Sequence, residues 1–128
     1  MGYRYLLPHE IEYIHLDLQH DHADISREIE LNSDMLESAA YLPKQSFYRG
    51  FFMKAAALFR SLVKNHAFGD GNKRVGFAAM VIFLERNGYH FEADNSDAVE
   101  FTVAVADSRI VDLQEIAAWI REHAISIR

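Results

Sequence analysis

The sequence predicts an all-α protein that forms one compact helical domain. In several segments apolar residues recur every three to four positions, as in an amphipathic helix, most clearly over residues 51–66 and 112–123. The chain of 128 residues contains only two prolines and no low-complexity tract, so no segment is typical of a linker. Half of the residues are hydrophobic, which is enough to bury one core at this length. We therefore expect residues 1–128 to form a single domain.

The first helix is expected to begin at Pro8, because proline suits the first turn of a helix. One stripe of this helix holds Ile11, Ile14, His15 and Leu18. Residues 21–32 are polar and predict a loop or a weak helix. Ser33 then resembles an N-cap, with acidic residues in the following turn, and predicts a short helix that runs to about Tyr41.

The next segment, "LPKQSFYRG", is expected to be irregular or extended because Pro43 ends the preceding helix. Residues 42–48 leave room for a short β-hairpin. The next segment, "FFMKAAALFRSLVKNH", is expected to form a helix. Its apolar face holds Phe52, Ala55, Ala56, Phe59, Leu62, Val63 and His66, and its opposite side holds Lys54, Ser61 and Lys64.

The segment "KRVGFAAMVIFLERNG" predicts a central helix, because it is apolar on every side once its charged start has passed. It is expected to begin near Asn72 or Lys73 and to end before Gly88, which suits a C-terminal cap. The small residues Gly76, Ala78 and Ala79 would let neighbouring helices approach closely.

Two more helices are expected after this one. The segment "DAVEFTVAVAD" alternates apolar and polar residues as a strand does, but its length and helical surroundings favour a helix. Asp112 is expected to cap the last helix, "LQEIAAWIREH", which has a clear amphipathic stripe.

Composition narrows the classes of function. The net charge of −6 argues against a general nucleic-acid binder, which needs a broad basic surface. The absence of cysteine excludes disulfides, thiolate metal sites and a cysteine nucleophile. The longest near-apolar run, residues 75–84, is too short to span a bilayer, and the N-terminus has no apolar core of signal-peptide length. We expect a cytoplasmic protein that binds neither membrane nor nucleic acid.

Histidines crowd the N-terminal region and suggest a metal site. They are His9, His15, His20 and His22. Their spacing does not gather them on one helix face, so a solvated helix end is the favoured interpretation.

One stretch, "HAFGDGNKRVG", combines residue types that phosphate chemistry uses. Gly69 and Gly71 let a ligand approach the backbone, and the expected helix start offers unpaired N–H groups to an anion. Lys73 and Arg74 add two positive charges there. A carboxylate among such groups makes sense if Mg²⁺ bridges it to a phosphate, which assigns that role to Asp70.

His66 adds a group that can accept a proton from an attacking hydroxyl. A solvated turn next to a packed histidine could contain the same residues. However, two cations at a helix N-terminus oppose its dipole, which favours a bound anion. The ordered set of polar residues therefore predicts a phosphate-transfer site.

The nine residues "HAFGDGNKR" resemble the signature of the Fic/Doc family, H-x-F-x-[D/E/N]-[A/G]-N-[G/K]-R, and fill all seven of its defined positions. Other stretches, including "LLPHEIEYIH" and "LQEIAAWIREH", are similar to its death-on-curing (Doc) branch, so the resemblance covers nearly the whole chain. It implies the all-α Fic fold, with the signature loop between two central helices and residues 42–48 as a flap that holds the target.

The resemblance also implies a role for each residue of the signature. His66 would be the catalytic base, Asp70 would hold Mg²⁺, and Phe68 would anchor the loop. The groups that contact the phosphates of ATP would be Gly69, Gly71, Asn72, Lys73 and Arg74.

Two positions distinguish branches of this family. Enzymes that transfer AMP usually have Gly at the position of Lys73 and a second Arg at the position of Phe77. Both departures resemble the Doc branch. This resemblance implies a toxin that phosphorylates a Ser or Thr hydroxyl of a protein such as elongation factor Tu. It also implies a small antitoxin that inhibits the toxin in trans. AMP transfer and a non-catalytic partner-binding module are the alternatives. "SDMLES" nearly matches the inhibitory motif of related Fic proteins but ends in Ser, and an ordinary capped helix start is the favoured explanation.

Overall fold

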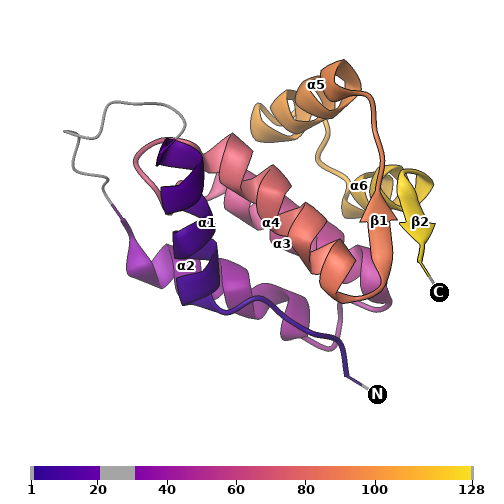
Figure 1. Ribbon diagram of the computed structural model, residues 1–128, viewed down its shortest axis with the longest axis horizontal. Helices are drawn as coiled ribbons and strands as arrows, with labels where there is room; N and C mark the ends of the chain where they lie inside the picture. Colours follow the sequence, from indigo (N-terminus) through magenta and orange to yellow (C-terminus); the bar gives the residue numbers. More distant parts are fainter. Residues whose placement is uncertain (1, 21–30, 128) are drawn as a thin grey trace.

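The computed structural model describes residues 2–20 and 31–127, and most of these residues are helical (Figure 1). The predicted all-α class is confirmed. The helices are α1 (Pro8–His20), α2 (Ser33–Tyr41), the short 3-10 helix η1 (Leu42–Lys44), α3 (Phe51–Lys64), α4 (Asn72–Arg86), α5 (Asn95–Ala106) and α6 (Leu113–Glu122). The loop or weak helix expected over residues 21–32 lies mostly outside the described residues. His22 and the side chain of His20, two of the histidines that suggest a metal site, also lie outside them.

Helices α3 and α4 run side by side through the centre of the molecule (Figure 1). Their close approach depends on Gly76, because a Cβ atom built there would lie 2.7 Å from Cγ2 of Val63 and 3.2 Å from its backbone N. Phe59, Leu62 and Phe83 are fully buried at this centre. The expectation that small residues permit close helix packing is therefore confirmed at Gly76.

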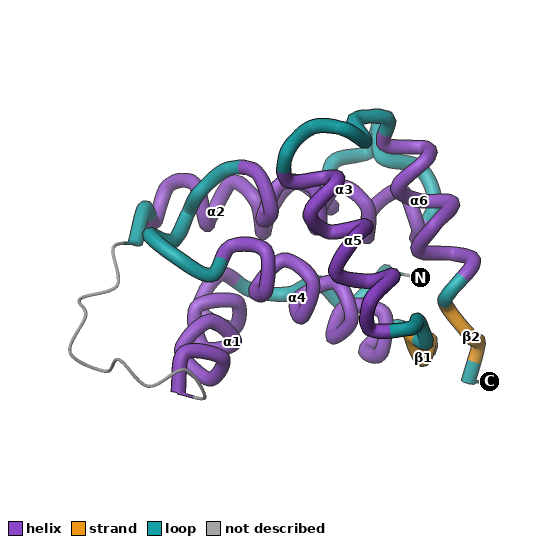
Figure 2. Tube along the Cα trace, turned by 90° about the horizontal axis from the view of Figure 1, so that it is seen from above, coloured by secondary structure: helices purple, strands orange, loops and turns teal. Residues whose placement is uncertain are grey.

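The other helices cover this central pair on different sides (Figure 2). Helix α1 packs on α4 and buries Ile11 completely, and α6 packs on α3. At the far end of α4, Arg86 forms a hydrogen-bonded ion pair with Glu10 of α1. The hydrogen bond from Arg86 lowers the pKa of Glu10 to about 2, against the opposing effect of burial.

A small antiparallel sheet joins two segments that the sequence did not identify as strands. Strand β1 (Tyr89–Phe91) pairs with β2 (Ala124–Ser126), and Tyr89 lies opposite Ser126. The strands are three residues long, too short to show an alternating pattern. Gly88, with a φ of +91°, ends α4 and leads into β1, as the expected C-terminal cap predicts.

The hairpin expected over residues 42–48 is absent, and a 3-10 helix followed by a turn takes its place. Pro43 occupies the start of this helix, and its carbonyl oxygen accepts a hydrogen bond of 2.8 Å from Nζ of Lys54. Lys54 was expected on the polar side of its helix, but it is only 9% exposed. The expectation was wrong because η1 covers this side of α3.

Three further expectations concern helix type and helix ends. The segment for which strand and helix competed forms α5, and Asp112 caps α6 by accepting a hydrogen bond of 3.0 Å from the backbone N–H of Gln114. The N-cap of α2 is Asn32 rather than Ser33, because the Asn32 side chain accepts from the backbone N–H of Met35.

No helix in the described part of the chain is both long and apolar enough to cross a membrane.

Candidate active site

The loop over residues 65–71 joins α3 to α4 and contains most of the predicted site. Asn65 ends α3 by donating its backbone N–H to the Ser61 carbonyl at 2.9 Å. His66 follows with a φ of +55°, and Gly71 precedes α4 with a φ of +81°. Both angles lie in the left-handed region, which glycine adopts without strain. Gly69 does not adopt a positive φ, so the expected glycine conformation is needed at Gly71 only.

Asn72 closes this loop with its side chain. Its Oδ1 accepts from the backbone N–H of Phe68 at 3.1 Å, and its Nδ2 donates to the carbonyl of Phe68 at 2.8 Å. Together these bonds satisfy both backbone polar groups of Phe68. The first residue of α4 therefore fixes the middle of the loop.

The segment that leads into α2 holds the loop from a second side. The backbone N–H of Asn32 donates to the Ala67 carbonyl at 2.7 Å, and Leu31 forms an antiparallel β-bridge with Phe68. Asn65 Nδ2 also donates to the carbonyl of Met35 at 3.1 Å. These contacts bring together residues that are thirty or more positions apart, and no pattern in the sequence indicates them.

Helix α1 holds the loop from a third side through His15. Its Nε2 lies 2.6 Å from the carbonyl oxygen of Asp70, and its ring stacks on Phe68 with the centroids 4.0 Å apart and the planes 7° from parallel. Both side chains belong to residues that are only 2% exposed. The expected place of His15 on the apolar stripe with Ile11 and Ile14 is therefore confirmed.

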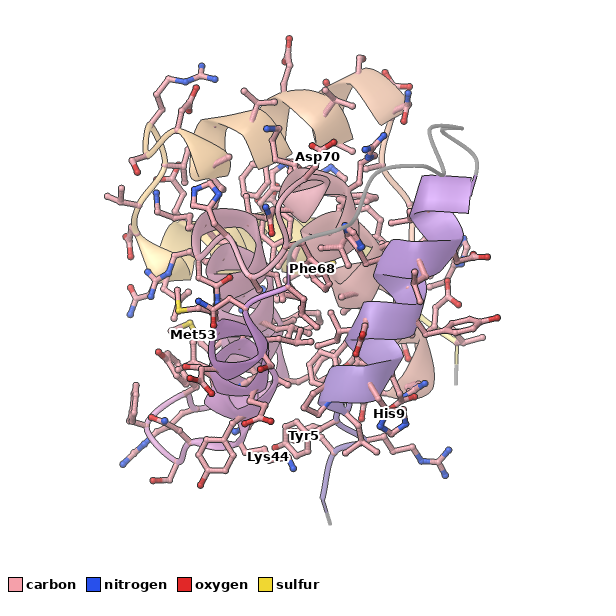
Figure 3. The ribbon with its side chains drawn as sticks, turned by 90° about the vertical axis from the view of Figure 1, so that its left-hand side faces the viewer. Tyr5, His9, Lys44, Met53, Phe68 and Asp70 are labelled. Atoms are coloured by element: carbon pink, nitrogen blue, oxygen red, sulfur yellow. The ribbon has the colours of Figure 1, made fainter. Side chains whose placement is uncertain are left out.

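Four polar side chains of the predicted site lie at the surface, on this loop or on the first turn of α4. His66, Asp70, Lys73 and Arg74 are all exposed, whereas Phe68 is buried beneath them. Figure 3 shows Asp70 and Phe68 on the connection between the helices, away from Tyr5 and Lys44 at the other end of the molecule. The predicted site therefore extends over the loop and the first turn of α4.

The start of α4 has the features of an anion site. Its N-cap is Gly71, which provides no side-chain cap, and its first turn contains no acidic residue. Lys73 and Arg74 form no ion pair with other residues in the described ranges 2–20 and 31–127. The N–H groups of the first turn, the helix dipole and two cations therefore coincide, and each of them favours a bound phosphate.

Asp70 lies at the edge of this positive region. One of its carboxylate oxygens, Oδ1, accepts the Gly71 N–H at 2.8 Å. Within the described residues no group of three or more His, Asp or Glu side chains could hold a metal ion by itself. A single carboxylate beside a phosphate site still fits Mg²⁺, which takes one or two protein carboxylates and completes its shell with phosphate oxygens and water.

The fold and the loop together define a class of helical protein in which an anion-binding helix start is preceded by an exposed histidine and aspartate. The comparisons with known proteins agree with this description. Residues 5–84 match the Fic/DOC family, and the chain belongs to this family. The chain is also 39% identical over 90 residues to Toxin Doc of Mycolicibacterium smegmatis, a match that covers 66% of this chain and 69% of that protein. Both findings confirm the resemblance seen in the signature, and they support a Doc-type toxin with transferase activity.

Proposed function

We propose that this chain is the toxin of a toxin–antitoxin pair and that it transfers the γ-phosphate of Mg-ATP to a Ser or Thr hydroxyl of a protein target. The observation that carries the proposal is the start of α4, which has no side-chain cap among the described residues. There two exposed cations and an exposed carboxylate adjoin the loop that presents His66. Phosphoryl transfer depends mainly on positioning and on charge neutralisation, and this arrangement offers both.

Each exposed side chain has a role in the proposed reaction. His66 takes the proton from the target hydroxyl, whose oxygen then forms a bond to the γ-phosphorus. The bond from the γ-phosphorus to the bridging oxygen breaks, and ADP leaves with that electron pair. Lys73, Arg74 and the first N–H groups of α4 hold the phosphate oxygens. Asp70 would hold Mg²⁺, which supplies charge neutralisation when it is bound.

Residues beneath the surface have supporting roles in this proposal. Gly71 allows the tight approach to α4, while Gly69 leaves the outer face of the loop open to a ligand. Asn72 was expected to contact phosphate, and its bonds to Phe68 add the task of holding the loop closed.

Phosphate transfer is favoured over AMP transfer by two side chains on α4. Phe77 lies where AMP-transferring relatives have a second arginine, and its ring packs edge-on against Phe91 with the centroids 5.5 Å apart. This position therefore offers no charge to a phosphate. Lys73 replaces the usual glycine and occupies space next to the helix start. AMP transfer through the same residues is the second candidate.

The partners follow from the same proposal. The target is a cytoplasmic protein with an accessible hydroxyl, for which a translation factor such as elongation factor Tu is the candidate. Similarity to a Doc toxin supports inhibition by a small antitoxin in trans. A binding module without catalytic activity is the contrasting possibility, and it would not need an exposed histidine at the start of the loop.

The test is to incubate the protein with a host lysate and ATP labelled at either the γ- or the α-phosphate. We expect label from γ-ATP, and none from α-ATP, to enter one protein, with a phosphate-sized mass increase on Ser or Thr. His66→Ala should abolish the transfer, while His90→Ala, which alters an exposed histidine on β1, should retain it. Transfer of the α-label would identify AMP transfer instead. If His66→Ala inhibited growth as strongly as the wild type does, the catalytic proposal would be wrong.

A further inference from the structure

We infer that His15 is a positioning residue that fixes the peptide bond between Asp70 and Gly71, and thereby aims both the metal-binding carboxylate and the start of α4. The inference rests on the proposed function only in taking Asp70 as the Mg²⁺ ligand. The position of His15 itself follows from the contacts of the described residues. His15 lies outside the nine-residue signature and touches it from another helix.

One peptide unit is held at both of its polar groups. The carbonyl of Asp70 accepts from Nε2 of His15 at 2.6 Å, and the N–H of Gly71 in the same unit donates to Oδ1 of Asp70 at 2.8 Å. In a trans peptide these two groups point in opposite directions. Rotation of the unit would therefore break both bonds together, and the bond to His15 restrains the carboxylate through the backbone.

His15 can hold this peptide rigidly because its own position is fixed. The residue is 2% exposed, and its ring lies parallel to that of Phe68, which is buried to the same degree. A carbonyl oxygen only accepts hydrogen bonds, so Nε2 carries a proton in this contact. The fully buried Ile11, one helical turn earlier, anchors the same face of α1.

The hydrogen bond to Asp70 and the ring contact with Phe68 can be separated by substitution of His15. His15→Phe keeps an aromatic ring against Phe68 but removes the donor. His15→Gln removes the ring but places an amide N–H where Nε2 of the imidazole was. If the hydrogen bond to Asp70 positions the loop, His15→Gln retains the function and His15→Phe does not. A role in packing alone predicts the opposite order.

His123 provides a matched control. Its Nδ1 lies 2.7 Å from the carbonyl of Trp119, and its ring contacts the Trp119 ring with the centroids 4.3 Å apart. His123→Phe therefore makes the same chemical change as His15→Phe, with loss of a bond to a carbonyl and retention of a ring contact. The difference is that it does so at the end of α6, which takes no part in the loop.

The first measurement is amide hydrogen exchange in the free protein, which requires no ATP and no target. We expect His15→Phe to accelerate exchange of the Gly71 and Val75 amides about tenfold, as the loss of one hydrogen bond would. These two amides are hydrogen-bonded in the wild type, to Oδ1 of Asp70 and to the Gly71 carbonyl. His15→Gln should stay within about threefold of the wild type, because the donor is retained. His123→Phe should leave these amides unchanged. Equal exchange in His15→Phe and the wild type would overturn the inference, and so would equal acceleration in both His15 variants.

The second measurement is the affinity for Mg-ATP by calorimetry, with ATP alone as the comparison. We expect His15→Phe to weaken binding of Mg-ATP about tenfold, and to weaken binding of ATP without metal much less, because the displaced group is the carboxylate. An equal loss in both would overturn the link to Asp70. If the wild type bound Mg-ATP but transferred no phosphate, the proposed reaction would fail while these two results would still decide the role of His15.

A third measurement protects the test if His15→Phe does not fold. In the wild type, the Nε2–H proton of His15 should give an NMR signal that exchanges slowly with water, with a coupling across the hydrogen bond to the carbonyl carbon of Asp70. A rapidly exchanging Nε2–H proton without that coupling would overturn the inference in the unaltered protein.

Discussion

Substitution of Gly76 by alanine tests how closely the two central helices pack. The added methyl group would lie 2.7 Å from Cγ2 of Val63, 3.2 Å from the Val63 backbone N and 3.4 Å from Cβ of Leu62. The first distance is far below a normal contact between carbon atoms, which is about 3.5–4.0 Å. The Val63 side chain is β-branched and only 2% exposed, so it has little room to rotate away.

Two opposing effects set the magnitude. Replacing glycine inside a helix gains about 1 kcal/mol of helix propensity. Overpacking a buried helix contact costs about 1–3 kcal/mol. Because both helices are held on their other faces by α1 and α6, we expect the cost to prevail. The free energy of unfolding should fall by about 1 kcal/mol, and Tm by about 4 °C.

The assay is equilibrium unfolding in urea, and a double-mutant cycle identifies the cause. Val63→Ala removes the clashing methyl group, so it should cost about 1 kcal/mol less in the Gly76→Ala background than in the wild type. Gly2→Ala is the control, since a Cβ there meets nothing within 4 Å. An unchanged or increased stability of Gly76→Ala, together with additive effects in the cycle, would refute the proposed close packing.

Two further changes test the ends of helices. The pKa of Glu10 is lowered from 4.5 to about 2 in the folded protein, so its pairing with Arg86 stabilises the fold above pH 4.5 and this stabilisation is lost as pH falls toward 2. Glu10→Gln should cost about 1 kcal/mol at pH 7 and progressively less as pH falls toward 2, measured by urea unfolding across this range. Equal costs at both values would contradict the pairing. Asp112→Ala removes the N-cap of α6 and should cost about 1 kcal/mol, whereas Asp112→Asn should cost less than half of that; equal costs would show that the cap contributes nothing.

The helices could be predicted because each is long enough to show its periodicity. Helix α5 is the instructive case, since its valines favour a strand while its twelve residues between other helices favour a helix. The length of the segment and its helical neighbours correctly predicted a helix. Strands β1 and β2 could not be found in this way, because three residues contain no period and their pairing joins segments on either side of α5 and α6.

Errors at helix ends came from tertiary contacts that the sequence does not display. Asn32 and Ser33 are both good capping residues, so propensity alone could not choose between them. The choice coincides with a bond from the Asn32 backbone to Ala67, in a loop more than thirty residues away. In the same way, Lys54 follows the polar pattern of its helix, and its burial is explained only by the position of η1 and the carbonyl of Pro43.

The signature loop was found in the sequence because its chemistry is contained in consecutive residues. What the sequence could not provide is the set of contacts that hold the loop in place. They come from His15 on α1, from Asn32 before α2 and from Asn72 on α4. Each joins a common polar residue to a backbone group, and such pairs leave no pattern along the chain.

His66 illustrates how this support is used. Its φ of +55° costs about 1 kcal/mol relative to glycine, which adopts this angle without strain. The residue is also exposed, so burial of its ring does not offset the free-energy cost of this backbone angle. The neighbouring bonds of Asn65 and Ala67 hold the backbone in this conformation. The exposed side chain of His66 is thus held at the surface of the loop by its neighbours, where the proton transfer proposed above would need it.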